Sequence, residues 1–120
     1  MIFERFFEKR HIKAKIKFIY QKIWDAKLLR EQLRAVREHI RQNYDYASEQ
    51  LRGIKDALAK PDIAKDVKKQ LEARQTEAEQ RVEALKADIA TADQKIEQTT
   101  NEITTHRSAL PLFNNYLESL

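Results

Sequence analysis

The sequence predicts an all-α protein, a long antiparallel two-helix coiled-coil hairpin with a short C-terminal helix packing at its base. Apolar residues return at alternating steps of three and four positions, as a helix with one buried face requires. The chain has one glycine and two prolines in 120 residues, and 35% of its residues are charged. One of the prolines, Pro61, stands at the middle of the chain. A helix with an apolar stripe buries it against another helix, so the two halves should pair.

The second helix is expected over about residues 62–109. Its apolar stripe has two polar gaps, Thr99 and His106, where apolar residues would continue the pattern. Buried polar residues at such positions can fix the register of a helix pair. The stripe consists of Val82, Leu85, Ile89, Ala92, Ile96, Ile103 and Leu110.

The first helix is expected over about residues 5–59. Two joins interrupt its stripe, with consecutive steps of three at Ile23-Ala26-Leu29 and of four at Val36-Ile40-Tyr44. Such slips locally change the supercoil, so we expect an irregular hairpin. The stripe consists of Ile12, Ile16, Ile19, Ile23, Ala26, Leu29, Leu33, Val36, Ile40, Tyr44, Ala47, Leu51, Ile54 and Leu58.

Two prolines set the predicted boundaries. Pro61 disfavours helix at the residue before it and fits the first turn of a new helix, which predicts a turn at about 60–62. Pro111 should end the second helix, leaving a tail helix at about 112–120. A turn near 60–61 places Ile12 opposite the neighbourhood of Leu110. The whole chain, residues 1–120, is then a single helical-hairpin domain.

Composition restricts the class of protein. The chain has no cysteine, which excludes disulfides and thiolate metal sites. Its N-terminus lacks the pattern of a secretory signal, and no stretch approaches the roughly 18–20 apolar residues of a spanning helix. We therefore expect a cytoplasmic protein, with attachment to a membrane surface as the alternative.

Charge is distributed unevenly. Residues 1–60 carry 15 Lys/Arg against 8 Asp/Glu, a net of +7, whereas residues 61–120 carry 8 against 11, a net of −3. Opposite signs favour two helices lying side by side, although exposed ion pairs contribute only about 0.2–1 kcal/mol each.

The base of the hairpin, where the termini meet, is the strongest candidate for function. It gathers most of the aromatic residues beside a basic run without acids from Lys9 to Lys22. We expect a non-enzymatic interaction or adaptor protein, which binds a protein partner with an acidic surface or self-associates. Pairing of two hairpins into a four-helix dimer is open. The residues expected to contact a partner are Phe3, Phe6, Phe7, Arg10, Lys13, Lys17, Phe18, Trp24, Phe113 and Tyr116.

Two other partners remain open. An aromatic and basic helix could lie on a membrane surface, with lysines near anionic lipid. A phosphate backbone could follow the basic residues of the first helix, although no nucleic-acid-binding motif is visible. This nucleic-acid track consists of Lys13, Lys15, Lys17, Lys22, Lys27, Arg30, Arg34, Arg37 and Arg41.

The pattern of residues does not favour catalysis. The three histidines, His11, His39 and His106, are far apart in sequence and lack a carboxylate pattern that would complete a metal site. Gly53 is the only glycine, so there is no glycine-rich phosphate loop. We expect no enzymatic activity and no cofactor.

The opening Met1-Ile2-Phe3-Glu4-Arg5-Phe6, followed by a helical hairpin, resembles the start of membrane remodellers related to phage-shock protein A and ESCRT-III. The resemblance covers this short segment and a generic architecture, and the chain lacks the further helices with which that family assembles. It implies contact with a membrane. Small coiled-coil proteins of the type III secretion stalk share the predicted shape without a specific residue match. We adopt neither family.

Overall fold

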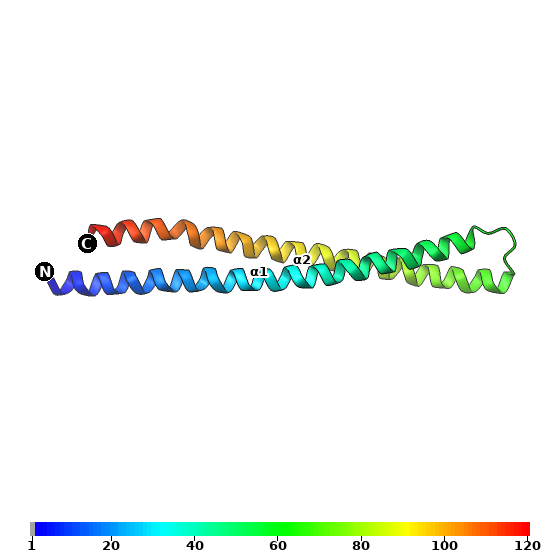
Figure 1. The fold of residues 1–120 in the computed structure, drawn as a ribbon, viewed down its shortest axis with the longest axis horizontal. Coiled ribbons are helices and arrows are strands. Elements are labelled where there is room, and N and C mark those ends of the chain that lie inside the picture. The colour runs from blue at the N-terminus through cyan, green and yellow to red at the C-terminus, as the bar shows by residue number, and fades with distance from the viewer. Residues whose placement is uncertain (1) are drawn as a thin grey trace. The chain divides into compact units, whose positions relative to one another are not determined.

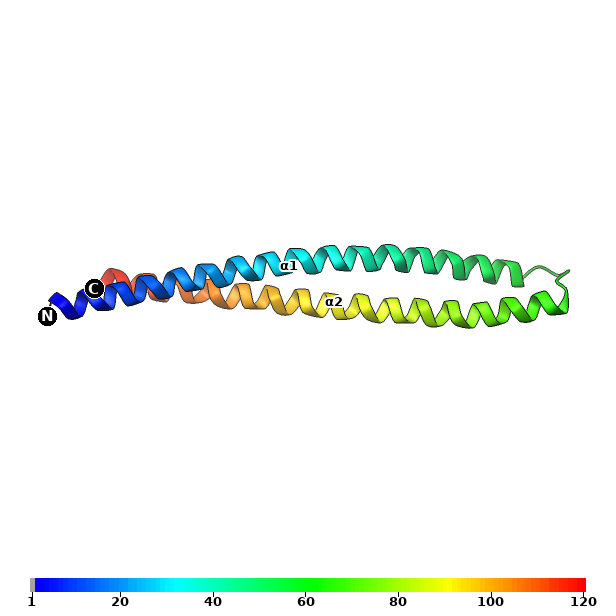
Figure 2. The same ribbon diagram turned by 90° about the horizontal axis from the view of Figure 1, so that it is seen from below.

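A computed structural model describes residues 2–120 as two long helices, α1 (Ile2–Leu58) and α2 (Lys65–Ser119). The described residues contain no strand, so the predicted all-α class is confirmed. The chain divides into two compact units: Met1–Leu33 with Gln94–Leu120 form unit 1, and Arg34–Asp93 form unit 2. Within each unit the α1 segment runs antiparallel to the α2 segment, as in a hairpin (Figures 1 and 2).

The apolar seam predicted for the second helix, α2, is confirmed. All of its residues are buried or half-buried, including the two polar ones, Thr99 and His106. The buried Thr99 satisfies its hydroxyl by donating to the Lys95 carbonyl at 2.8 Å. Steps of four and three continue without a break over the helix. The full α2 seam is Leu71, Gln75, Ala78, Val82, Leu85, Ile89, Ala92, Ile96, Thr99, Ile103, His106, Leu110, Phe113 and Leu117, and Leu120 continues the repeat just beyond the end of α2.

The seam predicted for the first helix, α1, is wrong at two residues. Leu29 and Val36 are 46% and 53% exposed, and Arg30 and Arg37 take their places as half-buried residues. The α1 seam therefore keeps a strict seven-residue repeat, because that repeat holds one face of a helix toward its partner. The α1 seam is Ile12, Ile16, Ile19, Ile23, Ala26, Arg30, Leu33, Arg37, Ile40, Tyr44, Ala47, Leu51, Ile54 and Leu58.

Arginine can occupy these two positions because its aliphatic stem covers apolar surface while the guanidinium reaches outward. In unit 2, Arg37 forms an ion pair with Asp93. In unit 1, the Nε of Arg30 is buried and has no hydrogen-bond partner among the described residues. The expected breaks in the supercoil are absent because charged residues, not apolar ones, continue the repeat.

The core is a thin line of seam residues. In unit 1, Ile19, Ile23, Ala26 and Ile103 form a buried cluster, and the partly buried Ala109, Leu110 and Phe113 pack against it. In unit 2, Ala47 and Ala92 are buried at 2% and 6% exposure. Such a core buries one face of each helix and leaves the other faces of α1 and α2 in contact with solvent.

The separate tail helix predicted at about 112–120 is wrong, because α2 continues through Pro111 to Ser119. Proline removes one backbone donor and leaves the carbonyl four residues earlier, here Arg107, without its partner. Both Pro111 and Arg107 are exposed, so water can reach that carbonyl. Phe113 and Leu117 also continue the seam, and their packing favours the helix beyond the proline.

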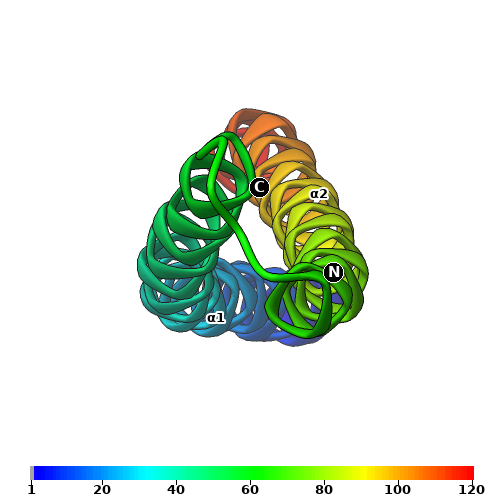
Figure 3. The ribbon, with the colours of Figure 1, turned by 90° about the vertical axis from the view of Figure 1, so that its right-hand side faces the viewer.

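The turn is longer than the predicted 60–62. Residues 59–64 are non-helical, so Pro61 lies inside the loop and α2 begins at Lys65 rather than near residue 62 (Figure 3). Ile63 is half-buried in this loop, and the burial of its side chain favours a longer non-helical segment before α2 begins. The register shifts accordingly: Leu110 packs against the cluster around Ile19, whereas a turn at 60–61 places it opposite Ile12.

Candidate docking surface

A second line of residues runs along α1 in unit 1, outside the seam. Its members follow steps of three and four, so they are neighbours on one face of the helix. We call this line the α1 stripe, and all of its members are exposed. The α1 stripe consists of Phe3, Phe6, Arg10, Lys13, Lys17, Tyr20, Trp24 and Lys27.

The N-terminal end of the α1 stripe is aromatic. Phe3 and Phe6 are 77% and 58% exposed. Phe7, which lies outside the stripe and is 62% exposed, meets Phe6 edge to face with ring centroids 5.8 Å apart. The exposed Ile2 lies on the same side of these first two turns. The large exposed fractions of Ile2 and the three phenylalanines show that α2 leaves these side chains uncovered. The start of α1 also extends slightly beyond the end of α2 in unit 1 (Figures 1 and 2).

The far end of the α1 stripe is also aromatic. Tyr20 and Trp24, 56% and 51% exposed, line an open groove together with Ile23, Lys27, Leu28 and Glu31. All of the groove's residues belong to α1. Tyr20 and Leu28 were missing from the predicted contact residues. The signal that identifies Tyr20 is the same three-and-four spacing that predicts a seam, applied to a second face of the helix.

The centre of the α1 stripe is basic. Arg10, Lys13 and Lys17 follow one another at one-turn spacing, and none of the three has an ion pair within residues 2–120. No acidic residue occurs between Glu8 and Asp25. The stripe therefore has the order aromatic, basic, aromatic over about 32 Å, at 1.5 Å rise per residue from Phe3 to Trp24.

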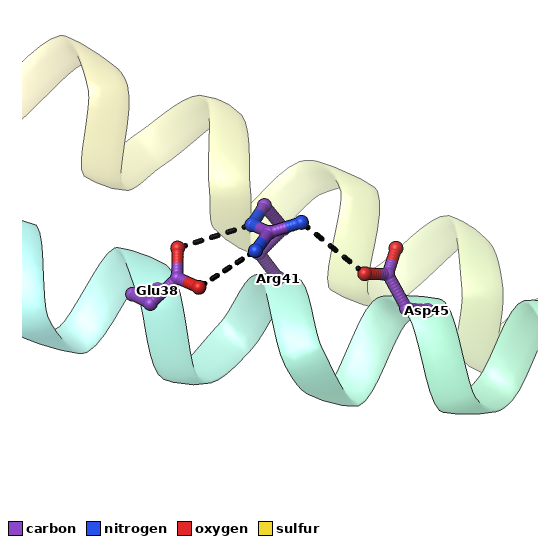
Figure 4. A network of polar contacts seen from close by, with 3 residues as sticks. All are labelled: Glu38, Arg41 and Asp45. Atoms are coloured by element: carbon purple, nitrogen blue, oxygen red, sulfur yellow. Dashed lines mark hydrogen bonds and ion pairs between the residues drawn. The ribbon is translucent and has the colours of Figure 1, made fainter.

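In unit 2, three successive residues at the equivalent heptad positions of α1, Glu38, Arg41 and Asp45, form an ion-pair network. Arg41 donates hydrogen bonds to both carboxylate oxygens of Glu38, at 2.7 and 3.0 Å, and to Asp45 at 3.3 Å (Figure 4). The hydrogen bond from Arg41 holds the pKa of Glu38 below its usual value, and the positive charges of Arg41 and Arg37 add to the effect. The same contacts raise the pKa of Arg41.

The net charge separates in the same way. Unit 1 has 11 Lys/Arg against 7 Asp/Glu, a net of +4, and unit 2 has 12 of each. All of the protein's net charge is therefore in the unit that carries the α1 stripe. Within the predicted nucleic-acid track, Arg37 and Arg41 are occupied by intramolecular ion pairs. Lys13 and Lys17, at the N-terminal end of this track, have no ion pair among the described residues.

The remaining predicted residues lie elsewhere in unit 1. Phe18 and Phe113 line a different groove, with His11, Lys15 and Ile19, and the Lys22 ammonium lies 5.2 Å from the centre of the Phe18 ring. Phe113 is half-buried because it packs against the core. Tyr116 is 45% exposed on α2. The α1 stripe thus contains six of the ten predicted residues. Phe7 contacts the stripe through Phe6, and Phe18, Phe113 and Tyr116 lie apart from it.

The histidines and acidic residues of the described part of the chain do not form a metal site. Within residues 2–120, no group of three or more histidine, aspartate and glutamate side chains is arranged to hold a metal ion. In the same residues, neither helix has a stretch long and apolar enough to span a lipid bilayer. His11 lines the groove around Phe18, and His106 is a half-buried seam residue.

Comparison with known proteins gives no assignment: no family model, no curated protein and no solved structure matches this chain.

Proposed function

We propose that this protein is a non-catalytic docking module that binds an acidic protein surface through the α1 stripe. The observation that carries this proposal is the row of exposed aromatic side chains on both sides of Arg10, Lys13 and Lys17. Exposed apolar patches of this kind are typical of interaction sites. Aromatic residues and arginine are enriched among the residues that contribute most to binding.

The size of the surface indicates a transient interface. An aromatic side chain offers roughly 150–250 Å² of surface, so the half-exposed rings of the stripe and Phe7 present roughly 600 Å². A standard interface buries about 800 Å² on each partner. The alkyl stems of the central basic residues bring the stripe close to that size. We expect binding in the micromolar range.

The charge of the stripe specifies the sign of the partner. Three neighbouring cations without internal partners attract an acidic surface and increase its association rate, an effect that salt weakens. Apolar contacts at the two ends then slow dissociation. This division of roles predicts that charge reversal at Lys13 and Lys17 mainly slows association, whereas loss of Phe6 mainly speeds dissociation.

Photo-crosslinking in the cells that make the protein tests this proposal. A photoreactive phenylalanine replaces Tyr20 in one variant and Tyr46 in another; these tyrosines are 56% and 61% exposed and lie in units 1 and 2. We expect a discrete protein adduct from position 20 that is lost with Lys13→Glu/Lys17→Glu, and none from position 46. Equal adducts from both positions, or an adduct that survives charge reversal, would contradict the proposal.

A second candidate is peripheral binding to an anionic membrane surface. It is supported by the exposed apolar side chains of Ile2, Phe3, Phe6 and Phe7 on the first two turns of α1. An interfacial helix places such a face at the acyl boundary with cations near the headgroups. This function predicts co-sedimentation with anionic vesicles that high salt weakens and Phe6→Ala/Phe7→Ala abolishes. Failure to bind at low salt would exclude it.

A further inference from the structure

We infer that the partner element is itself a helix, with an acidic centre between two apolar clusters, and that it lies along the α1 stripe as a third helix. The inference rests on the proposed function and specifies the partner's structure and charge order. The stripe supplies the complementary order: Phe3 and Phe6, then Arg10, Lys13 and Lys17, then Tyr20 and Trp24.

The periodicity of the stripe points to a helical partner. Its members keep alternating steps of three and four over six turns of α1, directly beside the seam positions. A line with that period winds slowly around the helix together with the seam. Another helix with the same repeat can follow it over its whole length, as in a coiled coil. An extended segment would leave the stripe after a few turns.

The α1 segment of a second copy does not fit this stripe. Antiparallel pairing of two α1 segments about Lys13, which would bring the aromatic ends together, places the basic centre of one copy against the basic centre of the other. Such a contact is isologous, so every cation would meet a cation, and like charges at an interface are unfavourable.

The α2 helix of a second copy does not fit either. It carries acids such as Glu97 and Glu102, but its exposed large apolar residues within the described part of the chain are Val67, Leu112 and Tyr116. These three lie near the two ends of α2, so no acidic stretch of about six turns has apolar clusters close on both sides. The charge and apolar order of the stripe therefore favour a different protein.

Trp24 provides the readout, because it is the only tryptophan in the chain and lies in the groove at one end of the stripe. Two synthetic, tryptophan-free helical peptides of identical composition are titrated into the full-length protein. One has glutamates at its centre and leucines toward its ends at heptad spacing, and the other has these positions exchanged. We expect the first peptide to shift Trp24 emission to the blue and to bind at least tenfold more tightly.

Charge exchange gives the specific control. The Lys13→Glu/Lys17→Glu variant should no longer bind the peptide with glutamates at its centre. It should instead bind a peptide with lysines at its centre. Lys68→Glu/Lys69→Glu, which changes the net charge equally on exposed positions of α2, should bind like the native protein. Circular dichroism of each variant shows whether its helices are retained. Failure of the exchange in a folded variant would overturn the inference.

Other outcomes separate the two proposals. Equal affinity for both peptides, with the crosslink from position 20 intact, overturns the helical partner and leaves the docking function standing. Absence of peptide binding together with absence of the crosslink overturns both. Binding to anionic vesicles in preference to either peptide overturns the inference in favour of a membrane surface. Self-association that Phe6→Ala and Trp24→Ala abolish overturns it in favour of a second copy.

Discussion

Arg37 on α1 donates a hydrogen bond from its Nε to a carboxylate oxygen of Asp93 on α2. This contact within unit 2 joins a seam position of α1 to a residue next to the buried seam residue Ala92. Arg37 therefore occupies the seam position, although the neighbouring residue in sequence, Val36, is apolar. Val36 is exposed instead. The repeat, and not the apolar character of each residue, determines which side chains face the other helix.

Replacing the seam arginines by leucine should stabilise the protein. The side chains of Arg37 and Asp93 are 36% and 51% exposed, so their ion pair contributes at most about 1 kcal/mol. A half-buried leucine contributes roughly 1 kcal/mol or more. Arg37→Leu should therefore raise the free energy of unfolding slightly. Arg30→Leu should raise it further, because it also removes a buried Nε without a partner. Urea unfolding measures both, and a loss of stability in Arg30→Leu would contradict the seam.

Truncation of neighbouring apolar residues distinguishes the observed seam from the one expected at first. Ile23 is 6% exposed, so Ile23→Ala should lower the free energy of unfolding by about 2–3 kcal/mol. Leu29 is 46% exposed, so Leu29→Ala should change it by less than about 0.5 kcal/mol. Thermal unfolding followed by circular dichroism compares them. A similar large loss in both variants would restore Leu29 to the seam.

Pro111→Ala should stabilise the end of α2. Proline in the middle of a helix costs about 3 kcal/mol relative to alanine, but only eight residues of α2 follow Pro111, so we expect a gain of about 1–2 kcal/mol. The matched control is Leu112→Ala, since Leu112 is 71% exposed and should contribute little. Amide hydrogen exchange of residues 112–119 should slow in Pro111→Ala. Unchanged exchange would show that the proline does not weaken this segment.

The contact between Glu38 and Arg41 should produce a defined pH dependence. Its hydrogen bond to Arg41 lowers the pKa of Glu38 in the folded state, so folding favours the ionised form. The resulting stabilisation is complete above the usual glutamate pKa and is lost as the pH falls through the lowered value. A carboxyl-carbon NMR titration should therefore show a low pKa for Glu38. Arg41→Ala should raise it, and an unchanged value would contradict the contact.

The sequence predicted much of this fold because an apolar stripe with a period of 3.5 residues has few alternatives. The all-α class and every residue of the seam predicted for α2 were correct. The errors at Arg30, Arg37 and Pro111 have a common physical origin. In each case the packing of a long helix outweighed a local preference, either the hydration of a charge or the conformational restriction of proline.

The candidate surface was predicted only in part. The aromatic and basic composition near the N-terminus pointed to the segment that carries the α1 stripe, including Phe6, Lys13 and Trp24. It could not assign Phe18 and Phe113 to a separate groove, because that depends on the register set by the six-residue loop. Tyr20 could have been found, since the spacing from Lys17 to Trp24 already places it on the same face of one helix.

α2 folds back on α1 and covers its seam, and this pairing determines which face of α1 stays free. Spin labels at Lys15 and Leu112 test it most directly, because Lys15 and the neighbouring Phe113 line one groove in unit 1. Paired helices are about 8–10 Å apart, so we predict a single short distance between the labels. A single continuous helix without a turn would separate the two labels by about 145 Å at 1.5 Å per residue. Absence of a short-distance population would show that α2 does not pair with α1 in this way.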